Sequence, residues 1–307
     1  MEAWRSMTQT TEVREHPELD PPVSHAGAYT AGEGVRSVDR MNGSPQCIPL
    51  LEFDGDSEAV IEPARMVHRQ DVPEACVLCF FGDVVESLRR LHRLRIAALF
   101  HSEAGTFPLY SLDIGGAAVG LFQSPVGAPA AAAFLEELIA AGCRRFVACG
   151  GAGVLRRDIA VGRVVIPDAA VRDEGTSYHY LPPSRKVVAD EASVAALVRV
   201  LERRHVPYLR GTTWTTDAGY RETRAAVERH RAEGCLTVEM EAAAFMAVAQ
   251  FRGVRFAQVL YAGDDLSGVS WDNRSWLSRQ SVREQLVWLS AEAALELPVE
   301  TGQIKRL

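Results

Sequence analysis

The stretch Thr237-Val238-Glu239-Met240-Glu241-Ala242-Ala243-Ala244-Phe245 places a carboxylate on either side of a methionine, where a strand-like run gives way to an alanine-rich one. Residues up to Val238 are typical of a strand end, and residues 242–251 carry apolar side chains at helical spacing. Acidic residues at such a junction favour the positive N-terminal end of a helix. They also suit a second task, because Glu241 could accept hydrogen bonds from both hydroxyls of a ribose while Met240 packs against the sugar. The stretch alone leaves both interpretations open.

Composition and charge narrow the classes of function. Of the 307 residues 47% are hydrophobic and 24% are charged, which is ordinary for a globular protein in water. The formal net charge of −7 gives no general electrostatic reason to expect a nucleic acid or a membrane as partner. No apolar run approaches the ~20 residues that cross a bilayer, and the N-terminus lacks the layout of a secretion signal. We therefore expect a cytoplasmic protein.

The six cysteines, at positions 47, 76, 79, 143, 149 and 235, bear on metals and redox state. The pair in Cys76-Val77-Leu78-Cys79 lies in an apolar, strand-like run, and neither a second pair nor a nearby histidine completes a zinc set. Buried free thiols in a reducing compartment are the better interpretation. No Gly-x-Gly-x-x-Gly follows the first predicted strand, so an oxidoreductase fold is not favoured. We expect neither a metal site nor a cofactor.

The chain divides into two regions of different character. Residues 1–45 are rich in Glu, Pro, Gly, Ser and Thr with little periodicity, which predicts a flexible N-terminal extension. Over residues 46–307 strand-like and helix-like runs alternate, which predicts one α/β domain with a mixed central sheet flanked by helices. Ligands of such folds lie beyond the carboxyl ends of the strands. The predicted strands are 76–81, 96–100, 117–122, 145–148, 163–166, 208–212 and 255–261, and the predicted helices are 84–94, 130–141, 191–204, 221–233, 242–251 and 282–295.

Glycine-containing turns follow several of these predicted strands. They are Gly82-Asp83, the segment 124–129, Gly150-Gly151-Ala152-Gly153 and Ala262-Gly263-Asp264-Asp265. Glycine lets backbone N–H groups approach a ligand closely, and helix N-termini attract anions. One such turn is weak evidence, but several at strand ends beside the Glu239–Glu241 run predict a ligand site.

In these motifs the chain resembles the nucleoside phosphorylase superfamily, which includes uridine phosphorylase, hexameric purine nucleoside phosphorylase and the methylthioadenosine nucleosidases. The resemblance covers roughly residues 77–268. Val238-Glu239-Met240-Glu241-Ala242-Ala243 is similar to the ribose-binding signature, and residues 150–153 stand at the family's Gly-rich loop. Residues 161–166 look like its following strand, and residues 171–180 resemble the uridine phosphorylase segment beside the nucleoside pocket.

The resemblance implies cleavage of the N-glycosidic bond of a nucleoside, by phosphorolysis to ribose 1-phosphate. Glu239, Met240 and Glu241 would hold the ribose. Asp264 stands where purine-specific members keep the aspartate that protonates N7 of the base, and we favour this acid role over the alternative of an ordinary acidic turn. The resemblance also implies a homo-oligomer.

The base-binding residues are less well marked. Tyr178 and His179 could cover the base, although aromatic residues in loops often serve packing alone. Tyr220 or Trp214 could stack on the base and Arg221 or Arg224 could reach its carbonyl oxygen, but both arginines could equally begin a solvated helix. Asp264 points to a purine, whereas residues 172–180 point to a pyrimidine, and the sequence leaves the choice open.

The arginines that hold phosphate in the family are missing from this chain. At the matching positions stand Glu86, Ala148 and Ser102, and Gly151 replaces a hydroxyl that also touches phosphate. Water would then replace phosphate as the nucleophile, with Glu86 as its general base. A third and weaker possibility is a nucleoside-binding protein without turnover.

Phosphate could still be held in another way. The backbone amides of Gly82, Gly150 and Gly151 could bind it together with basic residues from elsewhere in the chain or from a second copy. Phosphorolysis leads because of the wider resemblance, and hydrolysis is the alternative. The basic residues considered for this role precede the first strand and are Arg65, His68 and Arg69.

Overall fold

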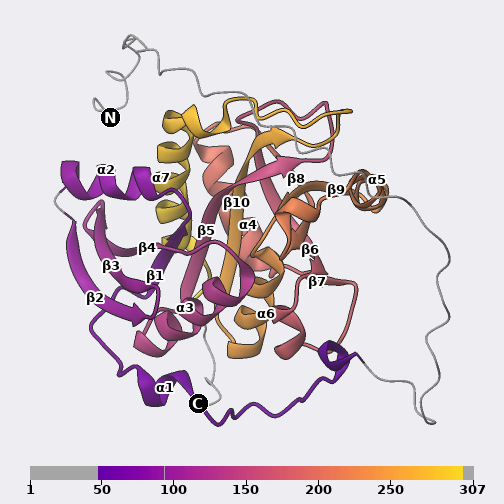
Figure 1. Ribbon diagram of the computed structural model, residues 1–307. Coiled ribbons are helices and arrows are strands. Elements are labelled where there is room, and N and C mark those ends of the chain that lie inside the picture. The colour runs from indigo at the N-terminus through magenta and orange to yellow at the C-terminus, as the bar shows by residue number, and fades with distance from the viewer. Residues whose placement is uncertain (1–47, 93, 300–307) are drawn as a thin grey trace, which may run out of the picture. The chain divides into compact units, whose positions relative to one another are not determined.

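The structure is a computed structural model that describes residues 48–92 and 94–299 (Figure 1). The predicted extension over residues 1–45 and Cys47 lie outside these ranges. The strands are β1 Ala75–Cys79, β2 Arg95–Ser102, β3 Gly105–Ile114, β4 Ala117–Gln123, β5 Arg145–Val154, β6 Val164–Asp173, β7 Lys186–Val188, β8 Tyr208–Thr216, β9 Cys235–Glu239 and β10 Arg255–Asp265. The helices are α1 Pro63–Met66, α2 Gly82–His92, α3 Ala128–Ala141, α4 Glu191–Arg203, α5 Arg224–Ala232, α6 Ala242–Arg252 and α7 Gln280–Glu296.

The strands form one mixed sheet in the order β10-β6-β8-β9-β5-β1-β4-β3-β2, with β7 beside β6. The pairs β1–β4, β1–β5, β5–β10, β6–β8 and β8–β9 are parallel, and the pairs β2–β3, β3–β4, β5–β9 and β6–β10 are antiparallel. Because β10 pairs with both β6 and β5, the strands β5, β9, β8, β6 and β10 close into a ring. The predicted α/β architecture with a mixed sheet is confirmed.

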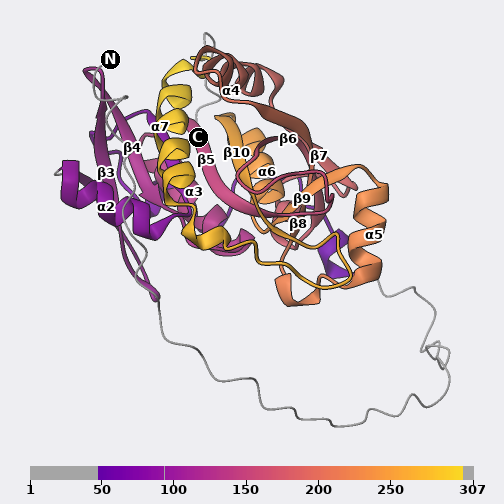
Figure 2. The same ribbon diagram turned by 90° about the horizontal axis from the view of Figure 1, so that it is seen from above.

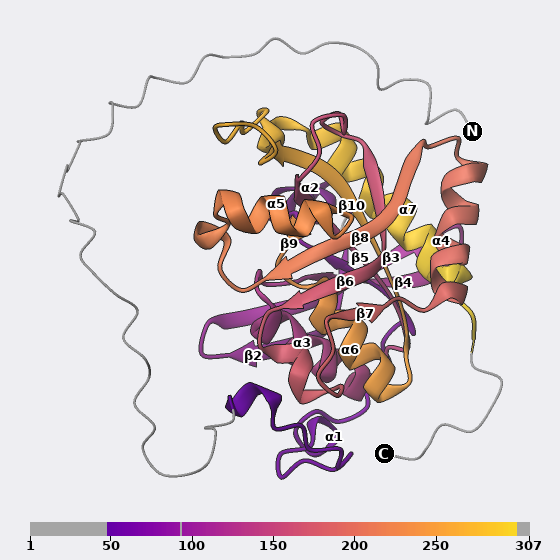
Figure 3. The same ribbon diagram turned by 90° about the vertical axis from the view of Figure 1, so that its right-hand side faces the viewer.

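Two groups of helices cover opposite faces of the sheet (Figures 2 and 3). On one face α3 packs with α6, where Leu135 and Phe245 are fully buried. On the other face α4 packs with α7, where Leu197 and Val287 are fully buried. Burial of apolar side chains on both faces provides the main stabilisation of such a layered domain. No helix within the described ranges is long and apolar enough to span a membrane.

Local sequence explains where the helices begin and end. The Asp190 carboxylate accepts a hydrogen bond from the N–H of Ala192 and caps α4, and the Thr223 hydroxyl accepts one from Ala226 and caps α5. The cap at Thr223 is the reason that α5 begins at Arg224 rather than at the predicted residue 221. Helix α6 ends at Arg252, and the next residue, Gly253, has a φ of +66°, the left-handed conformation that commonly terminates helices.

The structure corrects the prediction at two glycine-containing segments. Gly150–Gly153 was expected to form a turn but continues β5, because this stretch pairs with β10 and, at Gly153, with β9. The acidic turn at 262–265 is likewise the last part of β10. Strand β3, which contains Pro108, was not predicted. Of the cysteines, the five in the described ranges are buried and free.

Candidate active site

The corner between β9 and α6 gives its two glutamates different environments. Both oxygens of the Glu239 carboxylate are occupied: one accepts from the N–H groups of Glu241 at 2.8 Å and Ala242 at 2.6 Å. The other accepts from the Thr215 hydroxyl at 2.6 Å, and that hydroxyl in turn accepts from the N–H of Ala243 at 3.0 Å. Glu239 therefore serves the helix N-terminus, as one of the two interpretations of the sequence expected.

Glu241 lies on the other side of the corner and has fewer partners. It is only 5% exposed, and its Oε1 accepts from the N–H of Gly127, the residue before α3, at 2.6 Å. Burial, followed by the nearby charge of Glu239, raises the pKa of Glu241 to about 8. Met240, beside it, is half-buried. Of the two glutamates, Glu241 has the greater capacity to accept hydrogen bonds from a sugar.

Asp264 lies at the same end of the sheet as this corner. Its Oδ1 is 3.5 Å from the position that a Cβ atom at Gly153 would occupy. Gly153 pairs with Val238, two residues before Met240. Asp264 and Val238, the residue before the Glu239–Glu241 run, therefore both lie next to Gly153 of β5. Its other oxygen, Oδ2, accepts from Nε1 of Trp271 at 2.6 Å.

A second carboxyl group, Glu222, stands near Asp264 and was missed by the sequence reasoning. Burial and then the charge of Asp264 raise the pKa of Glu222 to about 7. Two residues further on, the Arg224 guanidinium donates to the carbonyl oxygens of Gly268 and Val269, the latter at 2.5 Å. These bonds join the segment that carries Glu222 to the loop that follows Asp264. The spacing of apolar residues gave no signal for Glu222, because Asp264, the group that acts on it, is distant in sequence.

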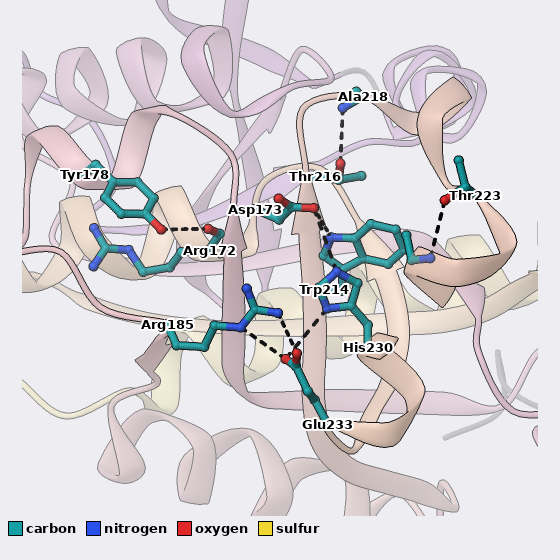
Figure 4. Close-up of polar contacts among 11 residues, drawn as sticks. Arg172, Asp173, Tyr178, Arg185, Trp214, Thr216, Ala218, Thr223, His230 and Glu233 are labelled. Carbon is teal, nitrogen blue, oxygen red and sulfur yellow. Dashed lines mark hydrogen bonds and ion pairs between the residues drawn. The ribbon is translucent and has the colours of Figure 1, made fainter. Parts of the chain in front are cut away.

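The predicted base-binding residues do not converge. Tyr220 is fully exposed and Arg221 is exposed, at the rim of the segment that carries Glu222. The Tyr178 ring lies against the Arg172 guanidinium, whose central carbon is 4.2 Å from the ring centroid. The Tyr178 hydroxyl donates to the Arg172 carbonyl oxygen at 3.0 Å (Figure 4). His179 is exposed and lines a separate cavity of about 510 Å³ with residues that include Met66, Glu136, Phe251 and Arg252.

Trp214 and Arg224 are also held by protein contacts. Trp214 is buried, its Nε1 donates to Oδ2 of Asp173 at 2.9 Å, and its ring stacks on that of His230 at 4.1 Å (Figure 4). Arg224 is directed to the carbonyls of Gly268 and Val269. In the described structure Tyr220, Arg221 and His179, all exposed, are the members of this group whose side chains make no such contact.

The charged residues that the sequence suggested for the nucleophile lie in different places, and some are paired with other side chains. Glu86, on α2, is half exposed and pairs with Arg89 at 2.6 Å and with Arg90 at 3.1 Å. The hydrogen bond from Arg89 lowers the pKa of Glu86, which makes this carboxylate a weaker base. Arg65 pairs with Glu58 beside α1, which lies far from α2 in Figure 1. His68 and Arg69 also precede β1 in the chain, so they lie before the amino end of this strand and not at its carboxyl end.

An unpredicted cation, Arg283 of α7, stands beside Gly82 and Asp83, which were expected to form a turn but begin α2. It is 7% exposed, its Nη2 lies 2.7 Å from Oδ1 of Asp83, and its guanidinium lies 4.8 Å from the ring centroid of Phe81. Close by, a Cβ atom at Gly151 would lie 3.1 Å from the ring of Tyr261, and one at Gly82 would lie 2.7 Å from Nε2 of Gln123. Side chains therefore fill the space that the two glycines leave open.

Comparison with known proteins gives the relationships of this fold. A family model described as Phosphorylase superfamily matches residues 74–292. A guanosine phosphorylase from Halorubrum lacusprofundi is 28% identical over 196 residues, which are 62% of this chain and 81% of that protein. A uridine phosphorylase from Salmonella typhimurium is 28% identical over 189 residues, 57% of this chain and 74% of that protein. The crystal structure of an AMP nucleosidase from Bacteroides thetaiotaomicron matches with a TM-score of 0.60 at 21% identity, covering 73% of this chain and 87% of the other, and so shares the fold.

Proposed function

The chain belongs to the phosphorylase superfamily, and from this membership we propose that it is an enzyme that cleaves the N-glycosidic bond of a nucleoside and releases the base. The observation that supports the proposal is the pairing of Gly153 with Val238, because a Cβ atom at Gly153 would lie 3.5 Å from Oδ1 of Asp264 and Val238 directly precedes the Glu239–Glu241 run. A group that binds the sugar and a group that serves the base are thereby held at one end of the sheet.

Glu241 and Met240 bind the ribose in this proposal, while the base lies towards Asp264. As the bond breaks, positive charge develops on the sugar and the base gains an electron pair at its ring nitrogen. A carboxyl group at the Asp264 side that carries a proton stabilises the departing base, and such donors commonly accelerate a reaction 10²–10⁴-fold. Tyr220 and Arg221, at the rim, remain candidates for contact with the base.

Inorganic phosphate is the acceptor that we propose, so that the product is ribose 1-phosphate. The phosphorylase activity named for two relatives supports this choice. So does Arg283, a cation beside Asp83 at the start of α2, which in this proposal takes the place of the arginines missing at the family's positions. The backbone amides of Gly82, Gly150 and Gly151 are further candidates for contact with the anion.

Hydrolysis is the second candidate, and a specific observation favours it. The ring of Tyr261 fills the space opposite Gly151, and Asp83 already pairs with Arg283. Water needs less room and less positive charge than a phosphate dianion. In that case Glu86 would act as general base only after leaving Arg89 and Arg90.

Base release from a panel of nucleosides, with and without phosphate, tests the proposal. The panel contains adenosine, inosine, guanosine, uridine and methylthioadenosine, and product analysis distinguishes ribose 1-phosphate from ribose. We expect release that requires phosphate. Equal release without phosphate would establish hydrolysis, and binding of a nucleoside without any release would indicate a binding protein.

A further inference from the structure

Trp271 lies in the loop 266–275, which follows β10, and its side chain holds one oxygen of Asp264. The indole Nε1 donates to Oδ2 of Asp264 at 2.6 Å. The residue is 62% exposed, so burial of apolar surface contributes little to its position. A hydrogen bond to a carboxylate is stronger than one between neutral groups, and here it sets the direction of the indole. Packing in the core therefore does not explain where this side chain lies, whereas the hydrogen bond does.

Polar contacts fasten the loop next to Trp271. The backbone of Asp272 pairs with that of Asp265, the last residue of β10, through hydrogen bonds of 2.8 Å and 3.1 Å. The Arg274 guanidinium forms an ion pair with the Asp265 carboxylate and donates to the carbonyl oxygen of Ile159 at 2.8 Å. The loop is thus folded back onto the end of β10.

Further contacts hold the first half of the same loop. The Arg224 guanidinium, at the start of α5, donates to the carbonyl oxygens of Gly268 and Val269, the latter at 2.5 Å. The N–H of Leu266 donates to the carbonyl oxygen of Val154, the last residue of β5, at 3.0 Å. Contacts with two further elements, β5 and α5, therefore determine the path of the loop. A loop fastened in this way can hold a donor in one fixed geometry, which is what the orientation of a reacting group requires.

The two oxygens of Asp264 have different neighbours. Oδ2 accepts from Trp271, whereas Oδ1 lies 3.5 Å from the position that a Cβ atom at Gly153 would occupy. Gly153 pairs with Val238, so Oδ1 is the oxygen next to the strand pair that leads into the Glu239–Glu241 run. An indole N–H can only donate a hydrogen bond. When Asp264 carries a proton, Oδ1 is therefore the favoured place for it, because Oδ2 already receives the indole hydrogen.

We propose that Trp271 is a positioning residue for glycosidic cleavage, which holds Asp264 so that Oδ1 presents the proton to the departing base. The inference rests on the proposed function and deepens it. It requires a purine substrate, because a purine offers N7 as a proton acceptor separate from the nitrogen that is bonded to the sugar. Trp271 belongs to none of the motifs that the sequence analysis singled out.

The proposed step balances in atoms and charge. The bond between C1′ and the base nitrogen breaks, its electron pair passes into the base, and the proton on Oδ1 of Asp264 moves to N7, leaving a carboxylate. An oxygen of phosphate, or of water in the hydrolytic alternative, forms the new bond to C1′. The proton that this acceptor loses restores the acid form of Asp264 through solvent, and no oxidant or reductant takes part.

The hydrogen bond from Trp271 becomes stronger during this step. Negative charge develops on Asp264 as its proton leaves, and a donor already in place stabilises that charge without having to reorganise. An interaction that is stronger in the transition state than in the bound substrate raises kcat and leaves KM nearly unchanged. Loss of the indole N–H should therefore appear in kcat.

A substrate that needs no proton separates this role from a purely structural one. In 7-methylguanosine N7 is already alkylated and cationic, so the base leaves without a donor. We expect Trp271→Phe, which keeps an aromatic ring but removes the N–H, to lower kcat for guanosine by about 10–100-fold, with KM nearly unchanged. The same variant should cleave 7-methylguanosine within a few-fold of the wild-type rate. Inosine and 7-methylinosine replace this pair if inosine is the better substrate.

Two further variants serve as controls. Trp271→His keeps a ring N–H, since Nε2 of histidine occupies the same place in its five-membered ring as Nε1 of tryptophan, and it should recover most of the guanosine turnover. Trp276→Phe removes the next tryptophan of the chain, whose ring lies against Gly263, and should leave the ratio of the two turnovers at its wild-type value.

Several outcomes would overturn the assignment. They are an equal loss of both substrates in Trp271→Phe, wild-type guanosine turnover in that variant, a Trp271→His variant as slow as Trp271→Phe, and the same change of ratio in Trp276→Phe. Cleavage of uridine but of no purine nucleoside would also overturn it, while the proposed function stands. No cleavage of any nucleoside by the wild-type protein would instead refute the proposed function.

Discussion

At the scale of single residues, Glu239 and Glu241 of the Glu239-Met240-Glu241 run have different hydrogen-bond partners, a difference that the sequence does not reveal. Glu239 stabilises the start of α6, and both of its carboxylate oxygens already accept hydrogen bonds from backbone or hydroxyl donors. Glu241 accepts from the N–H of Gly127 and is buried at 5% exposure. Two glutamates of one short run thus differ in their hydrogen-bond partners, and we expect variants of the two to fail in different ways.

Glu241→Ala should abolish ribonucleoside cleavage mainly through lost sugar contacts. We expect kcat/KM to fall by at least about tenfold, which corresponds to the loss of about 1.4 kcal/mol of binding to the transition state. The measurement is steady-state kinetics with a ribonucleoside and its 2′-deoxy analogue. The deoxy substrate should lose less, since it lacks one of the hydroxyls that Glu241 would bind. An equal loss for both would contradict the sugar-binding role.

The raised pKa of Glu241 should make stability depend on pH. The folded chain keeps the Glu241 proton up to about pH 8, whereas the ordinary pKa is 4.5, so folding takes up a proton between these values. This contribution is fully present below pH 4.5 and is lost as the pH rises through about 8. The free energy of unfolding, measured with urea at a series of pH values, should show a smaller decline over this range in Glu241→Gln. An unchanged decline would contradict the assignment.

At the scale of elements, one threonine joins three of them. Thr215 in β8 donates to Glu239 of β9 and accepts from the N–H of Ala243 in α6. The adjacent Thr213 hydroxyl instead bonds within the pair β8–β9, to Thr237. The position of the helix relative to the sheet therefore depends on a polar contact as well as on apolar packing.

Thr215→Val should destabilise the fold and displace the start of α6. The change leaves the buried Glu239 without one donor and the Ala243 N–H without its acceptor, which costs about 1–3 kcal/mol. Thr215→Ser keeps the hydroxyl and is the matched control. Urea unfolding of the two variants should differ by about that amount. Equal stabilities would show that the methyl group, and not the hydroxyl, matters at this position.

Elements with a local signature were predictable, and contacts that are distant in sequence were not. Helix α6 follows from its alanine-rich apolar run, and its predicted start at residue 242 is confirmed. The continuation of β5 through Gly150–Gly153 was missed because glycines indicate a turn until their partner strands are known. Glu222 and Arg283 had no motif around them, and only the fold places them beside Asp264 and Asp83. The roles of the other site residues remain predictions.

At the scale of the whole molecule, a buried ion pair links α3 to α6. Nε of Arg252 lies 2.7 Å from Oε2 of Glu136, and the two side chains are 6% and 8% exposed. Nη1 of Arg252 also lies 3.4 Å from Glu62, which adjoins α1. Charges so far from water are stable only while they remain paired.

Glu136→Leu should therefore be strongly destabilising, by about 3–5 kcal/mol, because it leaves the Arg252 charge with the more distant Glu62 alone. The double variant Glu136→Leu with Arg252→Met removes both charges and should recover most of that loss. Thermal and urea unfolding of the single and double variants measure the difference. A double variant no more stable than Glu136→Leu would show that the cost comes from packing.

The closed ring of strands also has a consequence for the synthesis of the chain. β5 is translated well before β10, yet Arg145 of β5 pairs with Arg255 of β10, and the ring cannot close earlier. The nascent chain must therefore expose the apolar residues of β5 while the intervening segments emerge from the ribosome, a state that favours chaperone capture. Asp264, near the end of β10, is delivered by the same strand that closes the ring. A growing chain consequently gains its closed ring and the candidate site residue Asp264 together, and a truncated product that lacks β10 has neither.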